Sequence, residues 1–294
     1  MAAESLEKLP LIVITGPTAS GKTSLAIELA AHYKGEIICA DSRTIYKGMD
    51  IGTAKPTAAE RALVSHWGLD LIEPGQPFSA ADFKQYAQQK IEEIRARGHI
   101  PFLVGGTGLY VDAVVFDYQF GPAADPTQRA WLESLSLEAL HTYCRDNNIR
   151  LPENDKNKRY VIRAIEQNNR IPLKKMTPIS TSIIVGIATD REILRQRIAK
   201  RSEQLFEDGV VDEATLLGEK YGWDNAAMTG NIYPLVRDYL LGKATLAEIK
   251  VKNATLDWRL AKRQLAWMRR SSFTTWLPLA EARDRLEQRL ANGD

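Results

Sequence analysis

Short apolar runs alternate with amphipathic segments along the first 120 residues of the chain. Apolar runs at 9–15, 36–40 and 100–104 predict strands. Helical spacing of apolar residues predicts helices at 24–33 and 79–97, and a further helix is expected to begin at about residue 107. Strands and helices that alternate in short succession form parallel sheets covered by helices on both faces. The pattern therefore predicts an α/β fold.

Local signals mark both ends of the helix at 79–97. Ser79 has the position of a cap, and Asp82 stands three residues later, as in a capping box. Phe78 and Phe83 have the spacing of a hydrophobic staple, and Gly98 ends the helix. This helix is thus predicted from its caps as well as from its apolar face.

The character of the chain changes after about residue 116. Residues 116–180 are polar, basic and helical without a strand candidate, and a strand returns at 182–188. A long helix then opens at Thr189-Asp190, and the chain is expected to be helical from about residue 209 to its end. Basic residues are expected on the outer faces of the long helix: Arg191, Arg195, Arg197, Lys200 and Arg201.

A helical segment between two strands of one sheet is most simply an insertion. We therefore predict a catalytic core made of residues 1–117 and 181–294, with an inserted helical domain at 118–180. The fold class is α/β: a P-loop NTPase-like parallel sheet flanked by helices, with the inserted domain and a helical C-terminal region.

Composition narrows the protein class. The chain has 294 residues, 26% of them charged, with 39 Lys and Arg against 37 Asp and Glu. This balance excludes global disorder, and no apolar run is long enough to cross a membrane. The first ten residues lack the apolar core of a secretory signal, the two cysteines cannot form a disulfide framework, and the four histidines show no metal-ligand spacing. We expect a cytoplasmic globular protein.

Two stretches concentrate positive charge within a chain whose net charge is only +2. Residues 150–175 hold eight basic and three acidic residues, and residues 250–270 hold seven basic residues against one acidic residue. Such stretches indicate a polyanionic partner, because neutralising phosphates releases counterions. A solvated helix face is the alternative for either stretch taken alone.

One motif predicts a phosphate-binding loop. The pattern G-x-x-x-x-G-K-[ST] is matched by Gly16, Pro17, Thr18, Ala19, Ser20, Gly21, Lys22 and Thr23. The glycines let successive backbone amides converge on an anion, the following helix adds its positive end, and Lys22 supplies a cation. The Thr23 hydroxyl can join a Mg²⁺ shell. The motif follows a strand and precedes a helix, which favours linked phosphates over a plain glycine turn.

The motif alone does not identify the ligand as ATP, although the pattern is also typical of ATP-binding loops. Hydrolytic P-loop enzymes place an acid for Mg²⁺ at the end of a later strand, whereas the strands at 100–104 and 182–188 run into glycines and a threonine. Only the strand at 36–40 runs into an acid, Asp41. Ligands lie beyond the carboxyl ends of parallel strands, so Asp41 is a candidate to accept a proton from a nucleophile. A turn or helix cap is the alternative role.

Several motifs in order make the chain resemble the tRNA dimethylallyltransferases, which prenylate an adenosine beside the anticodon. They are the loop at 16–23, Asp41-Ser42, the run 46–56, the helix start at 78–83, the run 104–110 and the run 260–265. The resemblance covers nearly the whole chain and weakens at 118–180 and 224–240. It implies that the loop holds the diphosphate of dimethylallyl diphosphate with Mg²⁺, and that the acceptor is the exocyclic amine of the adenosine 3′ of the anticodon.

The resemblance also implies roles for single residues. Asp41 matches the family's general base, and Thr18 matches a threonine near the diphosphate and the amine. The implied contacts to the tRNA anticodon stem-loop are Asp41, Ser42, Arg43, Thr44, Thr107, Arg129, Asn157, Lys158, Arg159, Arg163, Lys262 and Arg263. No membrane partner is implied, and we expect a monomer.

Two departures from the family pattern leave alternatives open. Thr229 stands where an arginine is expected to clamp the diphosphate, and Arg197, Arg201 and Arg263 are the candidates to replace it. The segment 118–152 is shorter than usual, so the insertion is expected to grip the anticodon stem less extensively. The alternative functions to tRNA prenylation are those of a P-loop kinase of small molecules or nucleotides, and of a tRNA-binding homologue with impaired catalysis.

Overall fold

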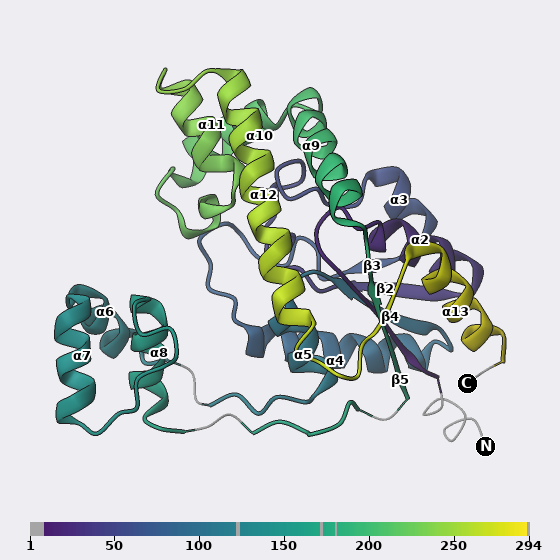
Figure 1. Cartoon of the computed structure of the whole chain (residues 1–294), viewed down its shortest axis with the longest axis horizontal. Coiled ribbons are helices and arrows are strands. Elements are labelled where there is room, and N and C mark those ends of the chain that lie inside the picture. Colours follow the sequence, from purple (N-terminus) through teal and green to yellow (C-terminus); the bar gives the residue numbers. More distant parts are fainter. Residues whose placement is uncertain (1–8, 122–123, 171–172, 180, 293–294) are drawn as a thin grey trace. The chain divides into compact units, whose positions relative to one another are not determined.

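A computed structural model of the chain describes residues 9–121, 124–170, 173–179 and 181–292. The chain divides into two compact units. We call Met1–Phe116 together with Thr177–Asp294 the core unit, and Asp117–Met176 the inserted unit. Figure 1 shows both units along the course of the chain.

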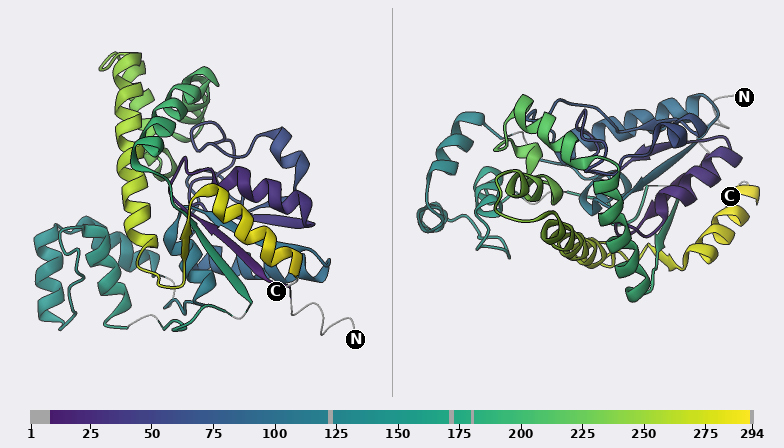
Figure 2. Two further views of the ribbon diagram at one scale, coloured as in Figure 1. Left: turned by 45° about the vertical axis from the view of Figure 1, so that its right-hand side comes forward. Right: turned by 90° about the horizontal axis from the view of Figure 1, so that it is seen from above.

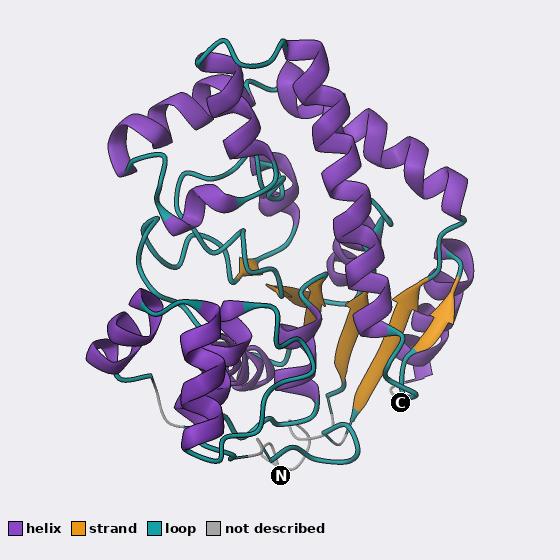
Figure 3. Cartoon of the chain, turned by 60° about the vertical axis from the view of Figure 1, so that its left-hand side comes forward, coloured by secondary structure: helices purple, strands orange, loops and turns teal. Residues whose placement is uncertain are grey.

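A six-stranded parallel sheet forms the centre of the core unit. Its strand order is β3-β2-β4-β1-β5-β6. The strands are β1 (Leu11–Thr15), β2 (Gly35–Cys39), β3 (His66–Trp67), β4 (Ile100–Gly105), β5 (Ser182–Ile187) and β6 (Thr275–Leu277). In register, Val13 of β1 lies opposite Leu103 of β4 and Ile184 of β5. All carboxyl ends therefore meet at one edge of the sheet, as the arrows in Figure 3 show.

The strands predicted from apolar runs are confirmed, whereas the two edge strands were not predicted. β1 is fully buried from Leu11 to Ile14, which explains its continuous apolar run. β3 and β6 have only two and three residues, too few to show a period. The expectation of an all-helical chain after residue 209 is wrong at β6, which pairs with β5 through tertiary contact.

Helices cover both faces of the sheet, as Figure 2 shows. On one face lie α2 (Lys22–His32) and α13 (Leu279–Asn292), with α3 (Ala58–Leu63) beside α2. On the other face lie α4 (Ala80–Ala96) and α5 (Gly108–Val115). The capping box predicted for α4 is present, since the Ser79 side chain accepts from the Asp82 amide. Phe83 of α4 stacks on Tyr110 of α5 with ring centres 4.2 Å apart.

A second helical group follows β5 at the carboxyl edge of the sheet. It consists of α9 (Arg191–Glu207), α10 (Val210–Tyr221), a 3₁₀ turn (Ala226–Thr229), α11 (Ile232–Leu240) and α12 (Leu246–Met268). The predicted start of α9 is confirmed, because Asp190 accepts hydrogen bonds from the Glu192 and Ile193 amides. Within the described residues, no helix combines the length and apolar character needed to cross a membrane.

The inserted unit is helical and has a core of its own. Its helices are α6 (Pro126–Ser134), α7 (Leu137–Asp146) and α8 (Lys158–Gln167). Leu132, Leu140, Cys144 and Val161 are fully buried among them. A bridge between Gln119 and Leu173 joins the segments that enter and leave the unit.

Candidate active site at the carboxyl edge of the sheet

The loop between β1 and α2 has the backbone shape that the glycine pattern predicts. Gly21 caps α2 with φ of +90°, a conformation that glycine adopts without strain. Ala19 also has a left-handed φ, of +62°. The amino end of α2 receives no side-chain cap, and its first turn holds no acid. Its backbone amides and positive helix end therefore suit an anion.

Lys22 places a cation directly at this loop. Its Nζ donates to the Pro17 carbonyl at 3.2 Å. Desolvation lowers the pKa of Lys22 to about 8; the negative charge of Asp41 opposes this shift, and the positive charge of Arg201 adds to it. The residue that follows β2 by one position and a residue of α9 thus both act on the Lys22 ammonium at the loop.

Thr18 is the point where distant segments meet the loop. Its amide donates to Gln264 Oε1 at 2.9 Å, and its hydroxyl accepts from the Arg201 guanidinium. Arg197, one turn before Arg201 on α9, donates to the Ser20 carbonyl at 3.4 Å. The expectation that Arg201 lies on an outer face of its helix is wrong, because α9 packs against the loop on this side. Single-residue reasoning also missed Gln264, whose only signal was its place in the run 260–265.

Asp41 follows β2 at the same edge of the sheet. Its Oδ1 accepts from the Arg43 amide at 2.8 Å, so one carboxylate oxygen holds the turn. The next residue, Ser42, donates its amide to the Thr107 hydroxyl at 3.0 Å, and the Thr107 amide donates to the Ala40 carbonyl at 3.2 Å. The ends of β2 and β4 are therefore tied together beside Asp41.

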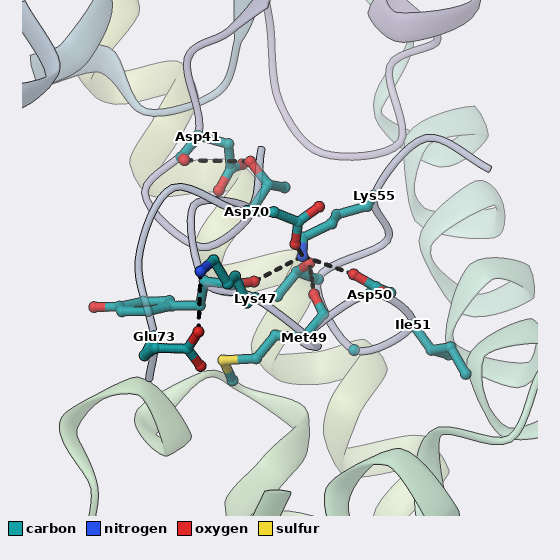
Figure 4. Close-up of polar contacts among 12 residues, drawn as sticks. Asp41, Lys47, Met49, Asp50, Ile51, Lys55, Asp70 and Glu73 are labelled. Carbon is teal, nitrogen blue, oxygen red and sulfur yellow. Dashed lines mark hydrogen bonds and ion pairs between the residues drawn. The ribbon is translucent and has the colours of Figure 1, made fainter. Parts of the chain in front are cut away.

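The segment after Asp41 is held from within by a buried ammonium group. Lys55, whose side chain is 1% exposed, donates to the carboxylates of Asp50 (2.7 Å) and Asp70 (2.5 Å) and to the Tyr46 carbonyl (2.7 Å). Figure 4 shows these contacts converging on Lys55. The two acids and the carbonyl together satisfy the buried charge. This cluster fixes the loop that begins at Asp41, and sequence patterns did not indicate it.

The predicted tRNA contacts of the core unit fall into two groups: residues after Asp41 that make internal hydrogen bonds, and residues exposed on α12. Thr44 is buried and donates to the Asp41 carbonyl at 3.4 Å, so its hydroxyl supports the turn. Arg43 donates to the Ala227 carbonyl at 3.4 Å and to the Thr229 hydroxyl at 3.3 Å. Lys262 and Arg263 are exposed on α12.

In the inserted unit, two predicted tRNA contacts are engaged in an internal cluster. Arg129 donates twice to Glu166, at 2.7 and 2.8 Å, and Arg163 donates to it at 3.2 Å. Burial raises the pKa of Glu166, but these hydrogen bonds outweigh burial and lower it overall. Asn157 caps α8, Lys158 donates to a backbone carbonyl, and Arg159 is exposed. Arg129 and Arg163 thus stabilise the fold of this unit.

Comparison with known proteins places this arrangement in a family. The family model described as IPP transferase matches residues 44–271. The chain belongs to the IPP transferase family. Among relatives of this family, the tRNA dimethylallyltransferase of Bacillus velezensis is 36% identical, over 96% of this chain and 95% of that protein. The tRNA dimethylallyltransferase of Roseiflexus sp. is 39% identical, over 95% and 96% respectively.

Solved structures of the same family have the same fold. The full-length tRNA isopentenylpyrophosphate transferase of Bacillus halodurans matches with a TM-score of 0.73 at 36% identity, over 97% of each chain. A eukaryotic dimethylallyltransferase acting on tRNA matches with a TM-score of 0.71 at 25% identity, over 88% of this chain and 69% of that one. The predicted family and α/β fold are confirmed.

Proposed function

We propose that this protein transfers a dimethylallyl group from dimethylallyl diphosphate to tRNA. The acceptor is the exocyclic amine of the adenosine 3′ of the anticodon, and the other product is diphosphate. One observation carries the proposal for a member of this family: the phosphate loop with Lys22, which follows β1, and the carboxylate of Asp41, which follows β2, lie at the same carboxyl edge of the sheet. An anion site beside a proton acceptor suits transfer from a diphosphate to an amine.

On the donor side, the loop stabilises the leaving group. The bond between the allylic carbon and the bridging oxygen breaks, and its electron pair passes to the diphosphate. This growing negative charge is stabilised by the backbone amides of the loop, the positive end of α2 and the Lys22 ammonium. Because the Thr18 hydroxyl accepts from Arg201, its own proton is available for a diphosphate oxygen.

On the acceptor side, Asp41 orients the amine and takes its proton as the new C–N bond forms. The Arg43 amide occupies Oδ1 of Asp41, which leaves Oδ2 for the amine. An exocyclic amine is a weak nucleophile, so alignment with the allylic carbon provides a large part of the rate. The adenosine must leave its stack in the anticodon loop to reach this carboxylate.

A divalent cation fits this site through the diphosphate. Within the described ranges, no three His, Cys, Asp or Glu side chains form a metal cluster. The Thr23 hydroxyl, in the first turn of α2, is the side chain that would hold Mg²⁺ together with the diphosphate. When bound, Mg²⁺ would neutralise charge on the departing diphosphate.

We assign tRNA contacts first to the predicted side chains that lie exposed. Arg159 in the inserted unit and Lys262 and Arg263 in the core unit carry positive charge to the surface. Such contacts to phosphates should make binding of the anticodon stem-loop fall steeply as salt rises.

Mass spectrometry of the RNA tests the proposed function. The protein is incubated with dimethylallyl diphosphate, Mg²⁺ and an unmodified anticodon stem-loop, and a loop with guanosine in place of the target adenosine is the control. We expect one dimethylallyl group on the adenosine-containing RNA only. An RNA that gains no mass, under conditions in which the protein is folded, would refute the proposal. Transfer of phosphate from ATP with release of ADP would favour a kinase instead.

A further inference from the structure

Arg201 places a guanidinium against the Thr18 hydroxyl of the phosphate loop. We infer that Arg201 is a direct ligand of the diphosphate, and that α9 provides the wall of the anion site opposite the loop amides. This inference rests on the proposed function. It adds a residue to that site and selects one of the three arginines considered as replacements for the arginine expected at position 229.

The position of Arg201 is set by buried packing. Next to it on α9, Ser202 donates to the Lys250 carbonyl of α12 at 3.0 Å and accepts from Asn253 at 3.0 Å. Ile198, one turn earlier, is buried against Ala261 of α12 and Ala19 of the loop. Because this side of α9 is fixed between α12 and the loop, the Arg201 side chain is held at the loop rather than free in solvent.

Arg201 has donor groups left for an anion. Its guanidinium donates to the Thr18 hydroxyl, while its Nε is buried and has no hydrogen-bond partner among the described residues. A guanidinium has five N–H donors in a fork that matches phosphate oxygens. A buried donor without a partner is costly, so a ligand that accepts from Arg201 would repay that cost.

The charges around the loop call for an anion. The positive charge of Arg201 lowers the pKa of Lys22, and the negative charge of Asp41 raises it. Arg197 adds a third positive group at the Ser20 carbonyl. A diphosphate carries the charge that would balance this group of cations.

The other candidates fit less well. Thr229 itself carries no charge, and its hydroxyl accepts a hydrogen bond from Arg43. Arg263 is exposed on α12, and the neighbouring residue Gln264 makes the contact to Thr18. Arg197 reaches the loop at the carbonyl of Ser20, which is itself an acceptor.

Binding of inorganic diphosphate, measured by calorimetry without RNA or prenyl donor, tests the inference. Arg201→Gln should weaken binding about tenfold to a hundredfold, the range for a hydrogen bond to a charged group. Arg201→Lys keeps the charge but loses the fork, and should lie between Arg201→Gln and wild type. Lys200→Gln is the matched control: it removes an exposed charge from the same helix and should bind within about twofold of wild type.

A double-mutant cycle separates direct contact from action through Thr18. Thr18→Val removes the hydroxyl that Arg201 contacts. If Arg201 binds the diphosphate itself, Arg201→Gln still weakens binding at least about fivefold in the Thr18→Val background. No further loss in that background would overturn direct contact, as would Arg201→Gln that binds diphosphate like wild type. Thermal unfolding checks each variant, and Arg201→Lys provides the test if Arg201→Gln does not fold.

The outcomes also distinguish this inference from the proposed function. Wild-type protein that prenylates RNA, with an Arg201→Gln variant that binds diphosphate normally, would refute the role of Arg201 alone. Wild-type protein that neither binds diphosphate nor prenylates RNA would refute both.

Discussion

Asp41→Asn is the substitution that most directly tests the proposed chemistry. The side-chain amide has the same shape as the carboxylate, and its Oδ1 can still accept from the Arg43 amide, 2.8 Å away. The ties from Ser42 and Ala40 to Thr107 do not involve the carboxylate. The turn should therefore persist, and we expect the free energy of unfolding to change by no more than about 1 kcal/mol.

Loss of the base should slow transfer about a hundredfold to ten-thousandfold. This range corresponds to about 3–5 kcal/mol of transition-state stabilisation. A second effect follows from charge: Asp41 raises the pKa of Lys22 against desolvation, so Asp41→Asn lowers that pKa further below its value of about 8. Near pH 8 the variant should therefore also bind diphosphate more weakly, whereas near pH 6.5 Lys22 stays protonated and the loss of the base is seen alone.

Single-turnover transfer to the anticodon stem-loop, measured at pH 6.5 and pH 8, separates the two effects. Binding of the same RNA is measured in parallel and should change by less than about threefold. Asp41→Glu, which keeps a carboxylate but moves it by one methylene, should retain more activity than Asp41→Asn. If Asp41→Asn at pH 6.5 transfers within tenfold of the wild-type rate, Asp41 is not the base.

Three further predictions concern the loop and the sheet that supports it. The ratio of wild-type to Lys22→Gln affinity for diphosphate should be greatest below pH 8 and decline above it, because the pKa of Lys22 is lowered to about 8. If Lys22 did not contribute its charge, calorimetry from about pH 6.5 to pH 9 would show a ratio that does not change with pH. Gly106→Ala should lower kcat/KM for the prenyl donor about tenfold, because the new Cβ would lie 2.4 Å from Gln264 Nε2 and displace the side chain that binds the Thr18 amide. The control is Gly121→Ala, which should leave kcat/KM unchanged because the space around Gly121 is open. Glu36→Gln, at the amino end of β2, removes a buried carboxylate that accepts twice from Arg97, so denaturant unfolding should show a loss of about 3 kcal/mol in stability with unchanged donor affinity. Burial raises the pKa of Glu36, but its hydrogen bonds lower that pKa overall. The stabilisation is therefore present above the usual glutamate pKa and is lost as the pH falls through the lower pKa of the folded state.

Sequence patterns predicted the local parts of this protein well. The long strands follow from uninterrupted apolar runs, and the start of α4 follows from Ser79 and Asp82, three residues apart. The phosphate loop follows from the positions of its glycines, one of which needs a left-handed φ. Asp41 was found because the end of a parallel strand is where ligands lie. In each case the deciding interaction spans a few residues, so the order of residues is sufficient.

The partners of these local parts were decided by the tertiary structure. Arg201 meets Thr18 across 183 positions, and Gln264 meets it across 246. No periodicity marks such pairs, because the arginines of α9 cannot be distinguished from one another by the local sequence. The packing of α9 against α12 decides which of them meets the loop. Arg129 gives the opposite case, since the family resemblance implied a tRNA contact for it, while Glu166, 37 positions away, engages its guanidinium internally. Sequence determined which chemical groups the protein has and where the backbone turns; the fold determined which charges and hydrogen-bond donors face one another, because that depends on the free energy of packing the whole chain.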